Sequence, residues 1–147
     1  MQYLSTRDKT AENSAARVIA RGLSRDGGLF VPETFPELAG ADIERLAGMS
    51  YIERAVFIMK LFLDDYTESE ITEYATKAYG RPGYDHPAVA PLHKTDGKTS
   101  FLELWHGPTC AFKDMALQML PHLLSAALDK TGEAKDVCIL VATSGDT

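Results

Sequence analysis

One lysine of the sequence, Lys113, stands in a setting that suits covalent chemistry. Phe112 precedes it and Met115 follows it closely, so its neighbours along the chain are largely apolar. Apolar surroundings and a nearby helix N-terminus both disfavour the ammonium form, and only the free amine can form a Schiff base with an aldehyde. Residues 107–109 predict a turn that presents this lysine at the start of a helix. An ordinary surface lysine in a first helical turn is the alternative, and the negative charge of Asp114 favours it.

A second segment, residues 141–147, joins a predicted strand to a polar turn. The continuous apolar run over residues 136–143 is typical of a strand buried on both faces in a parallel sheet. The Ser-Gly-Asp-Thr sequence that follows aims N–H and hydroxyl groups at one point, which suits an anion. Ligands bind beyond the carboxyl ends of strands in open α/β sheets. A plain strand-to-helix turn capped by Asp146 or Thr147 is the alternative.

The elements that must position these residues begin with a mostly helical region. Apolar spacing predicts one helix after a cap at Asn13 or Ser14, with Gly22 at its end. Ser50 and Thr67 each have a glutamate three positions later, the spacing of a capping box, so each predicts the start of a further helix. Between the first two helices, Asp26-Gly27-Gly28 predicts a turn. A short extended piece over residues 29–31 follows this turn and stops at Pro32.

The second half of the chain changes in composition after Gly80. Residues 81–87 contain two prolines and a glycine and predict a connecting loop. Asp96-Gly97 lies between extended runs over residues 92–104 and indicates a β-hairpin. A helix is then predicted from Phe112 or Lys113 towards Lys130, ending at Thr131-Gly132. Pro121 should kink or split that helix.

Composition and charge exclude several classes of function. The chain of 147 residues is 45% hydrophobic and carries a formal net charge of −6, with its basic residues scattered among acids. Nucleic acid and anionic membranes need a clustered basic face, so neither is expected as a partner. No apolar run is long enough to span a bilayer, and the N-terminus does not resemble a secretory signal. Two cysteines do not form a disulfide framework or a metal site, which favours a cytoplasmic location.

Length and pattern together favour one α/β chain of two unequal regions. Residues 1–85 are predicted to be mostly helical, and residues 86–147 to begin an α/β domain built on a parallel sheet. A buried parallel strand needs neighbouring strands and covering helices, which this sequence does not supply after Thr147. We therefore expect the chain to be the front part of a larger protein. Its oligomeric state cannot be predicted from the sequence.

Four segments in a fixed order resemble the threonine synthase family. They are residues 3–7, residues 22–32, residues 103–114 around Lys113, and residues 142–147. The resemblance covers essentially the whole chain. It implies a fold-type II enzyme dependent on pyridoxal 5'-phosphate (PLP). That enzyme converts O-phosphohomoserine and water to L-threonine and phosphate, the last step of threonine biosynthesis.

The same resemblance assigns roles to residues at matching positions. Lys113 corresponds to the lysine that forms a Schiff base with PLP and moves protons, and Phe112 and Asp146 are expected beside the cofactor. The loop expected to hold the substrate carboxylate consists of Thr143, Ser144, Gly145, Asp146 and Thr147. No metal is expected. A non-catalytic interaction module and a related phospholyase acting on another phosphorylated amine are the alternatives. His106 is interpreted either as a cofactor or phosphate contact or as a cap of the turn that follows it.

Overall fold

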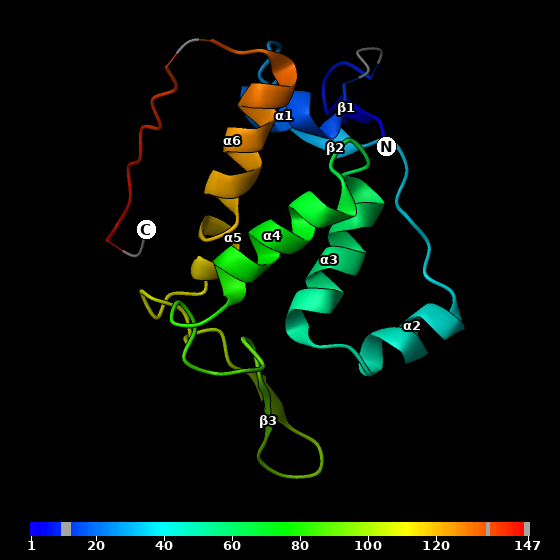
Figure 1. Ribbon diagram of the computed structural model, residues 1–147, viewed down its shortest axis with the longest axis vertical. Helices are drawn as coiled ribbons and strands as arrows, with labels where there is room; N and C mark the ends of the chain where they lie inside the picture. Colours follow the sequence, from blue (N-terminus) through cyan, green and yellow to red (C-terminus); the bar gives the residue numbers. More distant parts are fainter. Residues whose placement is uncertain (10–12, 135, 146–147) are drawn as a thin grey trace.

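The computed structural model describes residues 1–9, 13–134 and 136–145 as helices, short strands and loops (Figure 1). Helices dominate the first part, and two antiparallel strand pairs lie at opposite ends of the molecule. In chain order the elements are β1 (Tyr3–Ser5), α1 (Ala15–Arg21), β2 (Phe30–Pro32), α2 (Gly40–Ala47), α3 (Tyr51–Phe62), α4 (Glu68–Tyr79), β3 (Leu92–Lys94), β4 (Ser100–Leu102), α5 (Asp114–Leu117) and α6 (Leu120–Thr131). The predicted mixture of a mainly helical first region with strands is confirmed.

The first strand pair anchors the N-terminus. β1 runs antiparallel to β2, with Ser5 opposite Phe30. The Ser5 hydroxyl is buried and donates to the Asp26 carboxylate, whose Oδ1 also accepts from the Gly28 N–H at 2.8 Å. A Cβ at Gly28 would lie 2.2 Å from the Ser5 hydroxyl oxygen, so this close approach requires glycine. The extended piece predicted at residues 29–31 is thus a real strand, displaced by one residue.

The predicted helix starts are confirmed because their caps are local. The Ser50 hydroxyl accepts from the Glu53 N–H at 3.3 Å, and the Glu53 carboxylate accepts from the Ser50 N–H at 2.7 Å. Thr67 and Glu70 repeat this capping box at the start of α4. Ser14 caps α1. These reciprocal bonds satisfy N–H groups that a helix start otherwise leaves without partners.

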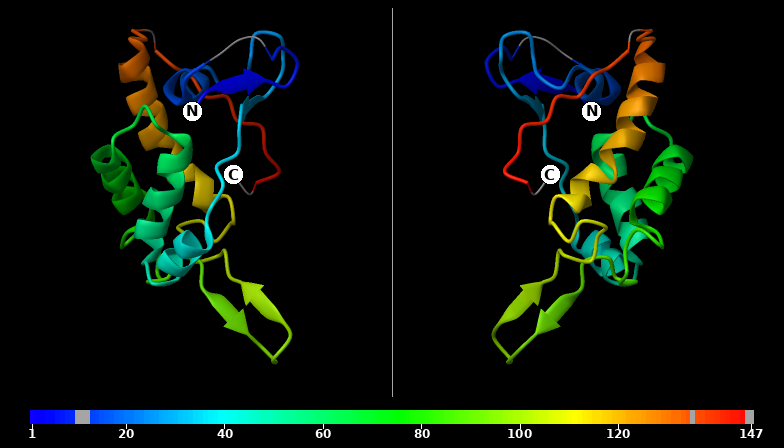
Figure 2. Two further views of the ribbon diagram at one scale, coloured as in Figure 1. Left: turned by 90° about the vertical axis from the view of Figure 1, so that its right-hand side faces the viewer. Right: turned by 90° about the vertical axis from the view of Figure 1, so that its left-hand side faces the viewer.

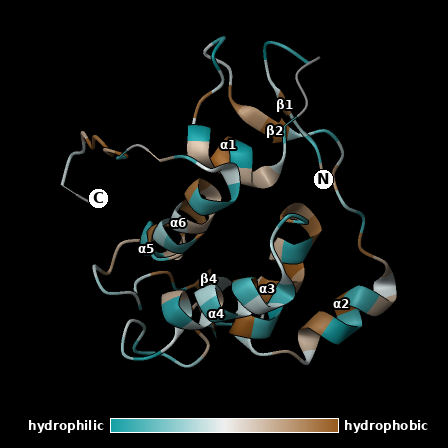
Figure 3. Cartoon of the chain, turned by 45° about the horizontal axis from the view of Figure 1, so that its top comes forward, coloured by the Kyte–Doolittle hydropathy of each residue, from teal (hydrophilic) through white to brown (hydrophobic). Residues whose placement is uncertain are grey.

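Helix α2 was not predicted from the sequence. Its N-cap is Ala39, which has no side-chain oxygen, so the usual sequence signal of a helix start is missing. The Asp42 carboxylate instead accepts from the Ala39 N–H at 2.9 Å. Figure 3 shows α2 with apolar and polar residues alternating along it, set apart from the other helices.

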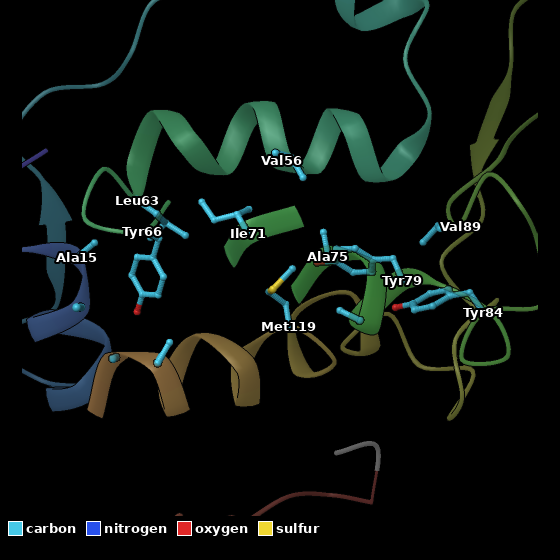
Figure 4. Packing of buried hydrophobic residues seen from close by; sticks show 14 residues of the cluster. Ala15, Val56, Leu63, Tyr66, Ile71, Ala75, Tyr79, Tyr84, Val89 and Met119 are labelled. Atoms are coloured by element: carbon cyan, nitrogen blue, oxygen red, sulfur yellow. The ribbon is translucent and has the colours of Figure 1, made fainter. Parts of the chain in front are cut away.

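One core joins helices α1, α3, α4, α5 and α6. Helix α1 packs against α6, and α3 against α4. Tyr66, Ile71, Ala75 and Ala127 are almost fully buried between them (Figure 4). The Tyr66 hydroxyl donates to the Leu123 carbonyl at 3.0 Å, so this buried polar group is satisfied. The core therefore includes residues on both sides of the predicted boundary at position 85.

The lysine helix and the hairpin follow the sequence predictions. The helix is split into α5 and α6, with Pro121 in the first turn of α6, where a missing N–H costs least. Gly132 ends α6 in a left-handed conformation. β3 and β4 pair antiparallel around Asp96-Gly97, and this hairpin projects from the body of the molecule (Figure 2). Within the described residues, none of the helices combines the length and apolar character that crossing a membrane requires.

The prediction of a buried strand over residues 136–143 is wrong for the structure described. This tail has no regular secondary structure, and Leu140 is 92% exposed. A parallel strand exists only when a neighbour supplies the other half of its hydrogen bonds, and the described residues place none beside it. Apolar β-branched sequence alone does not form the strand.

Candidate active site

A tight turn delivers Lys113 to the start of α5. The Cys110 N–H donates to the Gly107 carbonyl at 3.1 Å, and the Asp114 N–H donates to the Ala111 carbonyl at 3.1 Å. Cys110 has a φ of 59°, an uncommon left-handed value for a non-glycine residue. The predicted turn is confirmed, and it extends to Lys113, which is the N-cap of α5.

Asp114 locks this turn from inside. Its side chain is 1% exposed, Oδ2 accepts from the Thr109 N–H at 2.8 Å, and Oδ1 accepts from the Thr109 hydroxyl at 2.9 Å. Gly107 lies against the same carboxylate, and a Cβ there would meet Asp114 Oδ2 at 2.5 Å. The sequence suggested only that Asp114 opposes deprotonation of Lys113. Its fixing of the turn was missed, because the burial of Asp114 and its bonds to Thr109 exist only once the turn has closed.

Lys113 and Phe112 belong to this locked segment but differ in exposure. Lys113 is partly buried, and its carbonyl accepts from the Ala116 and Leu117 N–H groups at 3.0 and 2.9 Å. Phe112 is 61% exposed. A primary amine on a turn fixed by hydrogen bonds, next in sequence to an exposed aromatic residue, fits an aldehyde-bearing aromatic cofactor such as PLP.

Two tyrosines hold α5 from the other side. The Tyr79 hydroxyl donates to the Met115 carbonyl at 2.9 Å, and the Tyr84 hydroxyl lies 3.6 Å from the Met115 sulfur. Both rings are buried. Burial, with a smaller contribution from the charge of Asp114, raises the pKa of Tyr84 to about 12, so its hydroxyl stays protonated at neutral pH. The turn that carries Lys113 is therefore fixed by buried groups on both sides.

His106 directly precedes Gly107 and contacts two carboxylates. Its Nδ1 lies 2.6 Å from Asp85 Oδ1, and its Nε2 lies 2.8 Å from Glu103 Oε2. Hydrogen bonds to Glu103 and Asp85 raise the pKa of His106 above its ordinary value. In this structure both ring nitrogens face carboxylates, an arrangement that neither sequence interpretation of His106 anticipated.

Part of the predicted substrate loop lies on the exposed tail. The Gly145 N–H donates to the Thr143 hydroxyl oxygen at 3.3 Å, and Ser144 lies between them. Figures 1 and 2 show the tail leaving the end of α6 and running back towards the level of α5. Asp146 and Thr147 lie outside the described residues. The anion-binding role of this loop stays a prediction.

In the part of the chain that the structure describes, no group of three or more His, Cys, Asp or Glu side chains could hold a metal ion. His122 instead stacks on Tyr74, with ring centroids 5.9 Å apart. Cys110 and Cys138 are exposed free thiols.

Solved structures define the class to which this fold corresponds. The structure of PLP-bound threonine synthase from Brucella melitensis matches 90% of the chain with a TM-score of 0.84 and 36% identity, over 28% of its own length. The yeast threonine synthase structure matches 90% of the chain and 27% of its own length, with a TM-score of 0.81 and 32% identity. The fold is therefore that of one region of threonine synthases.

Sequence relatives lead to the same family. Threonine synthase of Pseudomonas aeruginosa is 41% identical over 148 residues, covering 100% of this chain and 31% of that protein. Human threonine synthase-like 1 is 35% identical over 99% of this chain and 20% of its own length. The family model for the threonine synthase N terminus matches residues 2–79. The chain belongs to this family, and it spans less than a third of the length of these relatives.

Proposed function

We propose that the chain is the N-terminal part of a cytoplasmic, PLP-dependent threonine synthase of fold type II. Such an enzyme is a carbon–oxygen lyase that converts O-phosphohomoserine and water to L-threonine and phosphate. The observation that carries the proposal is the turn locked by Asp114, which holds Lys113 half-buried at the start of α5. Residues 1–85 would form the N-terminal region, and residues 86–147 would begin the cofactor domain.

In this proposal Lys113 holds PLP through a Schiff base and carries protons on its Nζ. The cofactor, when bound, supplies the electron sink for elimination and replacement. Phe112 and Asp146 would line the cofactor, and residues 143–147 would bind the substrate carboxylate through N–H and hydroxyl groups. Asp114 would keep the lysine in place, because its carboxylate binds Thr109 and fixes the turn.

The test compares two lysine variants of the full-length protein. Lys113→Ala removes the amine, and we expect it to abolish both the visible absorbance of bound PLP and threonine formation. Lys98→Ala is the matched control, since Lys98 is an exposed lysine next to the hairpin turn. A Lys113→Ala protein that keeps both cofactor absorbance and turnover would show that Lys113 is not the cofactor lysine.

A related phospholyase that acts on another phosphorylated amine is the alternative. The chain is also similar to human threonine synthase-like 1, at 35% identity over 99% of this chain, so the similarity is not limited to proteins named threonine synthase. Assays of the full-length protein with O-phosphohomoserine and with O-phosphoserine would separate the two. The 147-residue chain alone is expected to form no threonine, because it spans only 31% of the Pseudomonas enzyme. Measurable turnover by the chain alone would contradict this.

A further inference from the structure

The His106 side chain joins two segments that are distant in sequence. Asp85 belongs to the loop after α4, and Glu103 follows β4 at the base of the hairpin. The imidazole contacts Asp85 through Nδ1 and Glu103 through Nε2, and its side chain is only 14% exposed. The Asp85 N–H also donates to the His106 carbonyl at 3.1 Å, so loop and hairpin base are held by side chain and backbone together.

The two contacts define the protonation state of the ring. An ionised carboxylate only accepts hydrogen bonds, and a neutral imidazole has a single N–H to donate. Both distances, 2.6 and 2.8 Å, are those of hydrogen bonds assisted by charge. His106 can therefore make both bonds only as an imidazolium, with a proton on each nitrogen.

Other groups around His106 do not remove this requirement. The His86 ring lies 5.0 Å from the His106 ring between centroids, and the Trp105 ring lies 5.8 Å away. The Arg81 guanidinium donates to the backbone carbonyl of Asp85 at 3.4 Å, and this bond leaves the Asp85 carboxylate to His106. The two carboxylates at hydrogen-bond distance favour the positive charge on His106.

Gly107 and Asp114 connect His106 to Lys113. Gly107 follows His106 and lies against Asp114 so closely that no Cβ fits between them. Asp114 in turn binds Thr109 and is the residue next to Lys113. A shift of His106 would therefore move Gly107 and disturb the packing that fixes the lysine turn.

We infer that His106 is a positioning residue, whose imidazolium ties Asp85 to Glu103 and thereby fixes the start of the turn that carries Lys113. The inference rests on the proposed role of Lys113 as the cofactor lysine. Loss of the ring proton leaves one carboxylate without a donor and loosens this end of the turn. The contribution is complete below the ordinary histidine pKa of 6.5 and is lost as the pH rises through the raised pKa of His106.

The test measures cofactor retention and kcat of the full-length holoenzyme as a function of pH. Wild-type protein should lose PLP absorbance and kcat on the alkaline side. His106→Asn keeps a donor towards Asp85 but cannot titrate. The variant should lower kcat at neutral pH by about tenfold, which is less than the roughly hundredfold loss that a misplacement of 1 Å can cause. It should also lack the alkaline transition of the wild type. His93→Asn, on the exposed strand β3, is the control and should behave as wild type.

Glu103→Gln provides a second variant that preserves side-chain shape. In this variant a neutral His106 can donate from Nδ1 to Asp85 while its Nε2 accepts from the newly introduced side-chain amide, so both contacts survive deprotonation. The variant should keep near wild-type kcat at neutral pH and show no alkaline loss. A wild-type alkaline transition in either Glu103→Gln or His106→Asn would overturn the inference. If Lys113→Ala kept its cofactor, the proposed function itself would fail, which is a different result.

Discussion

Gly107→Ala probes the packing on which the lysine turn depends. The added Cβ would lie 2.5, 2.7 and 2.9 Å from Oδ2, Cβ and Cγ of Asp114, all closer than real Cβ contacts. Overpacking a filled site costs about 1–3 kcal/mol. If Asp114 moved instead, it would weaken its bonds to Thr109, and a hydrogen bond to a charged group contributes about 1.5–3 kcal/mol. Because neither route avoids the cost, we expect the free energy of unfolding to fall by about 2 kcal/mol.

Urea unfolding followed by the fluorescence of Trp105, the one tryptophan of the chain, measures this change next to the site. Gly97→Ala is the matched control, because a Cβ there meets no atom within 4 Å and its φ is not in the left-handed region. It should change the free energy of unfolding by no more than about 0.5 kcal/mol. Equal stability of Gly107→Ala, Gly97→Ala and wild type would refute the tight packing between Gly107 and Asp114.

Three further predictions concern the helices behind the site and use the same unfolding assay. Ser50→Ala should lower the free energy of unfolding by about 1 kcal/mol through loss of the α3 cap, with Ser100→Ala, outside any cap, as control. Tyr66→Phe should lower it by about 0.5–1.5 kcal/mol, because the Leu123 carbonyl loses a buried donor. A hydrogen bond from Lys130 lowers the pKa of Glu70 to about 2, so its stabilisation is lost as pH falls from 4.5 to about 2. Glu70→Gln keeps the capping geometry, and its free energy of unfolding should change less with pH between 4.5 and about 2 than that of the wild type. The same pH dependence in the variant and the wild type would contradict the pairing of Glu70 with Lys130.

The parts of the fold that were predicted correctly depend on neighbours in sequence. Capping boxes at Ser50 and Thr67 use residues three positions apart, and the Asp96-Gly97 hairpin turn is equally local. Helix α2 escaped prediction because Ala39 carries no capping oxygen and Asp42 alone binds the free N–H. A helix start without a side-chain oxygen at the N-cap lacks one half of the capping box, and the remaining acid is too weak a signal to predict the helix.

The sequence pointed to the centre of the candidate site but not to its supports. Local composition predicted the turn before Lys113 and left an ordinary surface lysine as the alternative, and the resemblance to threonine synthases assigned Lys113 its proposed role. The contact between His106 and Asp85, 21 residues apart, depends on how the loop after α4 meets the hairpin base. No spacing rule links a histidine to an acid across that distance. The close fit of Gly107 against Asp114 also appears only when the turn is closed.

The candidate substrate loop follows an apolar run that forms no strand in this structure. An apolar, β-branched run such as residues 136–143 indicates what a segment can do inside a sheet, whereas the strand itself needs a partner. In this structure the run is exposed, and the Gly145 N–H donates to the Thr143 hydroxyl oxygen in the turn that follows it. The lysine turn, by contrast, is fixed by buried groups within the described chain. We therefore expect Lys113 to be in position before the loop that would bind the substrate carboxylate, and pairing of residues 136–143 with another strand to be the step that completes the site.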